Sequence, residues 1–211
     1  TSEWSTRSFT PRHATYPFGA SMVAVDSQLY VVSFRDTSDS LSQIYHAAHM
    51  NRKLSRFDPN HNTWKYLKPM ESVRVGSVLL ASNAELFLIG GVDPSAYSFR
   101  TCSTFETYCI QRNVWTGVEP TTTRSYVFSA GAQLGGFFYV LGGIDNFEET
   151  ASMHTLAYAS PIRRWATSTS MINCRSAFGV AALKYCIIAC GCLLYTSPSP
   201  RDRTRSRMPS S

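Results

Sequence analysis

Two groups of residues have types and spacings that could bind a metal. His46 and His49 form a His-x-x-His pair, which could bind zinc if both side chains shared one face of a helix. Cys186, Cys190 and Cys192 share one parity, which on a strand would place three thiols on one face. The histidines lack a third ligand, and the cysteines lack the Cys-x-x-Cys spacing of zinc ligands. We therefore expect an ordinary polar loop, inert buried thiols and no metal site.

No catalytic constellation is visible in the rest of the sequence. It has no nucleophile elbow, no glycine-rich loop for phosphate, and no carboxylate pair that can be placed at one site. We expect a protein that is not an enzyme and that needs no cofactor.

A further group of candidate ligands repeats along the chain. Arg74, Arg124 and Arg175 are 50 and 51 residues apart. They could bind an acidic ligand around a central channel, or they could hydrogen-bond to backbone carbonyls. Their regular repetition favours the structural role. The nearby serines leave the same two interpretations open: Ser77, Ser125 and Ser176.

Other markers share this period. The tryptophans Trp64, Trp115 and Trp165 are 51 and 50 residues apart, and an aromatic residue precedes each by seven positions. Each tryptophan should bury a large area between neighbouring units, with its N–H directed at a hydrogen-bond acceptor. Twin glycines occur at Gly90-Gly91 and Gly142-Gly143, with a degraded version at Cys190-Gly191. A period of about fifty residues is typical of one four-stranded blade of a β-propeller.

The run before each twin glycine predicts a strand that is buried on both faces. In residues 85–91 (ELFLIGG), Leu86 and Leu88 point to one face, while Phe87 and Ile89 point to the other. A strand packed between two neighbouring blades has this pattern, whereas a half-exposed hairpin alternates with polar residues. The glycines are expected where backbones crowd and φ is positive.

These segments resemble the kelch repeat, as in LSRFDPNHNTWKYLKPMESVR (residues 54–74) followed by ELFLIGG. The resemblance runs from about Trp4 to Gly191. It implies an all-β fold, namely a partial kelch-type β-propeller of about three and a half four-stranded blades out of six.

The repeat also predicts how the chain is divided. Residues 1–11 are expected to form the last strand of a preceding blade, and residues 12–192 the kelch repeats. The blades are expected at residues 12–67, 74–118 and 124–168, with a partial blade at 175–192. A long polar insertion separates strands two and three of the first blade. Residues 193–211 are rich in Ser, Pro and Arg and resemble translated vector sequence, so we expect a disordered, non-native tail.

Composition excludes several classes of partner. The 211-residue chain has a formal charge of +6, but half of this excess lies in residues 193–211, so the charge does not favour nucleic acid. No glycosylation sequon, signal peptide or membrane-spanning run is visible. With six cysteines read as reduced thiols, we expect a cytoplasmic protein that does not bind membranes.

The resemblance also implies where partners dock. In the family they commonly bind the face that carries the loops after the twin glycines, here residues 35–49, 92–100 and 144–153. Aromatic and charged residues on loops are the usual interface anchors. The loop candidates are Arg35, Asp36, Tyr97, Phe99, Arg100, Phe147, Glu148 and Glu149.

We therefore predict a protein-interaction module. The resemblance implies a substrate-recognition propeller of a BTB-kelch adaptor for a cullin-type ubiquitin ligase, with a protein substrate as its partner. The cullin would bind through a BTB region that is absent from this chain. The alternatives are an actin-binding cytoskeletal kelch protein and, with less support, a kelch-fold enzyme such as a copper oxidase or a sugar epimerase.

Overall fold

The regular elements of the structure are β-strands. The computed structural model describes residues 17–36, 50–82, 84–93, 100–121, 127–145, 148–149, 153–156 and 165–191. Helix is absent from these ranges, and so is any helical segment apolar and long enough to span a membrane. The predicted all-β class is confirmed.

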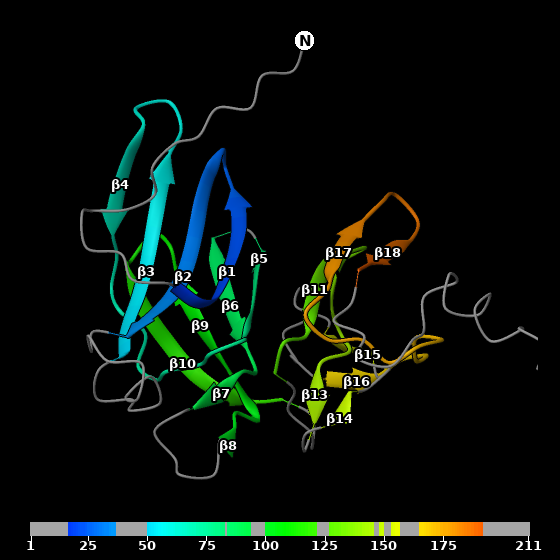
Figure 1. The fold of residues 1–211 in the computed structure, drawn as a ribbon. Helices are drawn as coiled ribbons and strands as arrows, with labels where there is room; N and C mark the ends of the chain where they lie inside the picture. The colour runs from blue at the N-terminus through cyan, green and yellow to red at the C-terminus, as the bar shows by residue number, and fades with distance from the viewer. Residues whose placement is uncertain are drawn as a thin grey trace, which may run out of the picture.

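Three sheets of four antiparallel strands follow one another along the chain (Figure 1). The first contains β1 (Pro17–Val25), β2 (Gln28–Asp36), β3 (Met50–Asp58) and β4 (Thr63–Tyr66). The second contains β5 (Val78–Ser82), β6 (Glu85–Ile89), β9 (Thr104–Cys109) and β10 (Val114–Pro120). The third contains β11 (Ala130–Leu134), β12 (Phe137–Leu141), β15 (Met153–Leu156) and β16 (Trp165–Thr167). Each strand pairs with the one before it in its sheet, which is the connectivity of a propeller blade.

A hairpin of β17 (Gly179–Ala182) and β18 (Ile187–Cys190) follows the third sheet. The first strands of successive units contact one another in the order β1, β5, β11, β17. These strands therefore lie on the inner side of an arc, and the later strands of each sheet lie outward. The arc is a partial kelch-type propeller, as the repeat predicted.

Strand β6 is buried on both faces, as its sequence predicted. Leu86 and Leu88 pack into a cluster that extends to Tyr30, Val32 and Leu54 of the first blade. On the other face, Phe87 and Ile89 pack into a second cluster, which reaches the third blade at Phe138 and Val140. The ring centroids of Phe87 and Phe138 are 4.9 Å apart in an edge-on arrangement. The two clusters join three consecutive blades through one strand.

The twin glycines adopt the conformation that the sequence required. Gly90 and Gly91 have φ of 66° and 89°, and Gly142 and Gly143 have φ of 58° and 99°. Only glycine adopts such angles without strain, so both strands end there.

The first blade lacks this signal. Ser33 and Phe34 occupy the position, and β2 runs on to Asp36, paired with β3 as far as Met50. The strand therefore extends past the position at which a twin glycine ends β6 and β12. The strand is longer because neither residue turns the backbone away from its partner.

Candidate protein-interaction face

Short two-stranded ribbons extend from the ends of the second strands. β7 (Val92–Asp93) pairs with β8 (Arg100–Thr101), and β13 (Ile144–Asp145) pairs with β14 (Glu148–Glu149). Each ribbon starts directly after a twin glycine. Both lie at the same end of the sheets, the lower end in Figure 1. The described parts of two predicted docking segments, residues 92–100 and 144–153, therefore share one face, which we call the ribbon face.

Five of the predicted loop residues lie in strands instead of loops. Arg35 and Asp36 are in β2, opposite Asn51 and Met50. The remaining three belong to the ribbons: Arg100, Glu148 and Glu149. The prediction of loops was wrong at these five positions, because the two ends of each connection pair with each other as strands. Tyr97, Phe99 and Phe147 lie outside the described residues.

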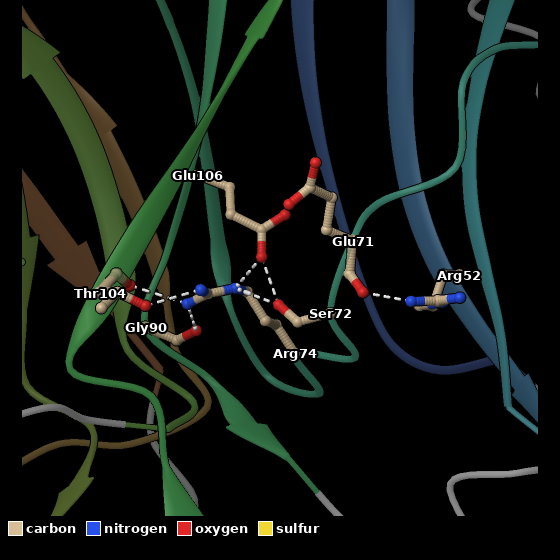
Figure 2. Close-up of polar contacts among 7 residues, drawn as sticks. All are labelled: Arg52, Glu71, Ser72, Arg74, Gly90, Thr104 and Glu106. Carbon is tan, nitrogen blue, oxygen red and sulfur yellow. Dashed lines mark hydrogen bonds and ion pairs between the residues drawn. The ribbon is translucent and has the colours of Figure 1, made fainter. Parts of the chain in front are cut away.

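A buried ion pair lies at the base of the β7–β8 ribbon (Figure 2). The Arg74 Nε donates to Glu106 Oε1 at 2.8 Å and to Ser72 Oγ at 3.0 Å. The guanidinium also donates to the carbonyl oxygen of Thr104 at 2.8 Å, to its hydroxyl at 2.6 Å and to the carbonyl oxygen of Gly90 at 3.4 Å. Ser72 in turn donates to Glu106. One side chain thus joins the segment before β5, the end of β6 and the start of β9.

These contacts leave Arg74 with little capacity to bind a ligand. Its guanidinium is buried and engaged by five acceptors on three segments. A buried charge of this kind fixes local geometry, and removing its partner would leave an uncompensated charge. Arg74 therefore holds the base from which β7 departs.

The next described repeat arginine makes a matching contact. Arg175 Nη1 donates to the carbonyl oxygen of Gly191 at 2.9 Å, as Arg74 Nη1 does to Gly90, and both bonds span 16 residues. β18 ends at Cys190, so Gly191 is the counterpart of Gly90 and begins the degraded pair. The sequence analysis placed the pair at Cys190-Gly191, one residue too early, because it matched Gly191 to the second glycine of the twin. Arg124 lies outside the described residues.

A backbone ladder links successive blades near the inner strands. The N–H of Phe128 donates to the carbonyl of Gly76, and the N–H of Ala177 donates to the carbonyl of Phe128, each at 2.9 Å. All three residues have positive φ, of 69°, 58° and 47° along the chain. The sequence did not predict this ladder, because only Gly76 carries the glycine that marks such a conformation.

The serines that the sequence grouped together do not occupy equivalent positions in the structure. Ser77 follows Gly76, so its counterpart after Phe128 is Ser129, whose hydroxyl donates to the carbonyl of Gly142 at 3.0 Å. Ser77 and Ser176 are both buried, and Ser125 lies outside the described residues. Blade three has two more residues between its arginine and its first strand than blade two, which shifts the alignment.

Two of the repeat tryptophans pack on the aromatic residue that precedes them by seven positions. Trp64 lies 4.8 Å from Phe57 and Trp115 lies 5.2 Å from Tyr108, between ring centroids of paired strands. Trp115 Nε1 donates to the carbonyl of Lys68 at 3.0 Å, which ties blade two to the connector from blade one. Within the described residues the buried Nε1 of Trp165 has no acceptor.

The cysteines are less buried than the sequence suggested. Cys186 and Cys190 are exposed, and Cys186 lies in the hairpin turn before β18 rather than in a strand. Ile188 and Cys190 point to the side of the hairpin that corresponds to Phe87 and Ile89 in β6. In β6 that side is covered by the next blade. In the described ranges no cluster of three or more potential metal ligands occurs. Cys192, His46 and His49 lie outside those ranges.

Comparison with known proteins agrees with this architecture. The chain is 31% identical to Kelch-like protein 26 of Danio rerio over 111 residues, which are 52% of this chain. It is 35% identical to Kelch-like protein 31 of Danio rerio over 74 residues, 35% of this chain. The solved kelch-type propeller YjhT superposes with a TM-score of 0.64 at 13% identity, covering 76% of this chain and 54% of that chain. Together these similarities support a kelch-repeat family for the chain. No protein-family model matches it.

The kelch relatives are much longer than the matched region. The matches span 17% and 11% of the lengths of Kelch-like proteins 26 and 31. At 13% identity, the similarity to YjhT concerns the kelch propeller fold alone.

Proposed function

We propose that this kelch chain is a non-catalytic protein-binding module that presents a protein substrate to a cullin-type ubiquitin ligase. In this proposal the ribbon face holds the substrate, and a BTB region outside this sequence binds the cullin. The similarity to two Kelch-like proteins supports the binding role. The ligase role is our extension from the family resemblance.

The single observation that carries the proposal is the ribbon face itself. Two ribbons leave adjacent blades at one end of the sheets. Backbone crowding at Gly91 and Gly142 fixes their bases, and Arg74 also fixes the base of the β7–β8 ribbon. A rigid scaffold that carries variable loop tips is the usual arrangement of a recognition surface. Arg100, Glu148 and Glu149 supply charge of both signs to the ribbons.

The proposal places the protein in the cytoplasm. The five described cysteines are free thiols, which fits a reducing compartment. Fractionation of cells that express the chain with an epitope tag tests this part; recovery only from a secreted or membrane fraction would contradict it.

Site-specific photo-crosslinking tests the binding role. A photoreactive amino acid replaces Arg100 in β8 and, as a matched control, the exposed Lys184 in the β17–β18 turn. We expect proteins from cell extract to cross-link through position 100 and not through position 184. Equal cross-linking at both positions, or none at position 100, would contradict a role for the ribbon face.

The ligase role is tested on the proteins that cross-link. We expect them to carry ubiquitin and to accumulate when cullin activation is blocked. Unchanged turnover would remove the ligase role while leaving the binding role intact. If actin were the cross-linked protein and the chain co-sedimented saturably with filaments, the cytoskeletal alternative would replace it.

A further inference from the structure

Four cations lie on segments that meet at the outer rim between the first two blades. Arg56 of β3 and Lys65 of β4 lie directly opposite each other in the strand register. The backbone N–H of Lys68 donates to Asn113 Oδ1 at 3.0 Å, and Arg112 precedes Asn113 in the β9–β10 turn. We call Arg56, Lys65, Lys68 and Arg112 the rim patch.

Contacts of Tyr108 tie the rim patch together across the two blades. The hydroxyl of Tyr108 donates to Asn113 Oδ1 at 2.7 Å. The charge of Arg56 is close enough to Tyr108 to act on its ionisation. The backbone of the blade-one connector and the Tyr108 hydroxyl therefore meet at one residue of the blade-two turn, Asn113.

The charges of the rim patch have few partners within the protein. Among the described residues, no ion pair joins Arg56, Lys65 or Lys68 to a carboxylate. Asp58, the acidic residue of β3, pairs with His61 at 2.8 Å. Like charges directly opposite on neighbouring strands destabilise a sheet, so the Arg56–Lys65 pair costs stability unless an anion lies over it.

The segment that carries three of the rim-patch cations has a local excess of positive charge. Residues 50–71 hold five Lys and Arg but only two Asp and Glu. Of these cations, Arg52 donates to the carbonyl oxygen of Glu71 (Figure 2), and Lys53 lies over the Tyr66 ring at 4.8 Å. The other three belong to the rim patch and are therefore the cations of this segment left to meet an external anion.

The rim patch borders an open sheet edge. β4 is the outermost strand of its sheet, with β3 as its single neighbour among the described strands. Lys65 lies on the same face as Arg56, while Tyr66, opposite Ser55, lies on the other. An extended chain paired with β4 would place alternate side chains over Lys65 and over Tyr66.

We propose that the rim patch and the β4 edge bind an extended, acidic segment of a partner protein as an added strand. Its anionic side chains face Lys65 and Arg56, and its intervening apolar side chains face Tyr66. The anion is a carboxylate or a phosphorylated side chain. This inference rests on the proposed protein-binding function and adds a second surface, away from the ribbon face, with the chemistry of its ligand.

Fluorescence anisotropy with the full chain tests the proposal. The probe is a short labelled peptide in which Glu alternates with Val, and the control peptide carries Gln in place of Glu. We expect saturable binding of the Glu peptide that weakens as salt rises to about 0.3 M, and much weaker binding of the Gln peptide. A third peptide with phosphoserine in place of Glu tells the two anion sources apart: tighter binding than the Glu peptide indicates phosphorylated side chains, and equal or weaker binding indicates carboxylates.

Charge-reversal variants locate the site. Lys65→Glu should weaken the Glu peptide about tenfold, because it replaces an attraction with a repulsion. Lys184→Glu reverses another exposed cation and should leave binding unchanged. Circular dichroism verifies that both variants are folded; if Lys65→Glu unfolds the chain, Lys65→Gln takes its place.

Several outcomes would overturn the rim proposal. The first is equal binding of the Glu and Gln peptides. The second is unchanged binding of the Glu peptide by folded Lys65→Glu. The third is tighter binding of a short DNA duplex or of anionic vesicles than of the Glu peptide. If cross-linking through Arg100 persists in these cases, the ribbon-face function stands alone. If rim binding is found without cross-linking at Arg100, the ribbon-face function fails and the rim patch stands.

Discussion

Arg74 and Glu106 form an ion pair of 2.8 Å with side chains only 3% and 1% exposed, between segments 32 residues apart. A buried pair costs much desolvation, and losing one partner is usually worse than losing both. We expect Arg74→Met or Glu106→Leu alone to lower the free energy of unfolding by about 3–5 kcal/mol. The double variant should recover much of that loss. Urea unfolding of the four proteins measures it.

Arg175 provides the matched control for this prediction. It occupies the same repeat position but is less buried, and its guanidinium donates a hydrogen bond to the carbonyl of Gly191. Arg175→Met should cost no more than about 1.5 kcal/mol. Equal losses for Arg74→Met and Arg175→Met would show that the buried pair is not the source of the effect.

Two glycines with the same φ allow the cost of backbone strain to be measured apart from the cost of a steric clash. Gly142 and Gly135 both have φ of 58°. A Cβ at Gly142 would lie 2.3 Å from the carbonyl oxygen of Arg175, whereas a Cβ at Gly135 would meet nothing within 4 Å. Gly135→Ala should cost about 1–2 kcal/mol through its left-handed backbone. Gly142→Ala should cost distinctly more, as measured by thermal unfolding; equal costs would contradict close packing at Gly142.

We predict that the buried Tyr108 hydroxyl makes the folded protein less stable at high pH. Burial raises the pKa of Tyr108 from 10.0 to about 12. Between these values the unfolded chain ionises its tyrosine while the folded chain does not, so stability present below pH 10 is lost as the pH rises toward 12. With allowance for solvent near the rim, the loss is at most about 2 kcal/mol.

Comparison with Tyr108→Phe isolates this contribution from the other tyrosines. The variant also loses the hydrogen bond to Asn113, so it should be about 1 kcal/mol less stable at pH 8. The gap between the two proteins should narrow as the pH rises toward 12. A gap that stays constant in urea unfolding would contradict a buried, neutral phenol.

Two half-buried thiols should differ in reactivity. The hydrogen bond from Arg112 Nε to Cys109 Sγ, 3.4 Å long, lowers the pKa of Cys109, while burial raises the pKa of Cys102. Since the thiolate is the reactive form, iodoacetamide should modify Cys109 faster than Cys102 near pH 7.5. Peptide mass spectrometry follows each site. Arg112→Gln should slow Cys109 and leave the exposed Cys174 unchanged; no slowing would contradict the role of Arg112.

The parts of the fold predicted from sequence were those with a short-range signal. Alternation in residues 85–89 predicted both buried faces of β6, and each twin glycine marked its own turn. Glu106 gave no such signal, because it lies in a buried strand and meets Arg74 only after the sheet forms. The ribbons were missed for a similar reason, since a two-residue strand is defined by its partner and not by its own sequence.

Phe87 and Ile188 occupy the same position in successive hairpins but meet different surroundings. Phe87 is 1% exposed between blades two and three, whereas Ile188 is 47% exposed on the open side of β18. Phe87→Ala should therefore cost about 3–5 kcal/mol of unfolding free energy, and Ile188→Ala about 0.5 kcal/mol or less. Urea unfolding at several protein concentrations measures both. If Ile188→Ala were as costly as Phe87→Ala, the outer side of the β17–β18 hairpin would be covered in solution, and a cost that grew with protein concentration would identify a second copy of the chain as the cover.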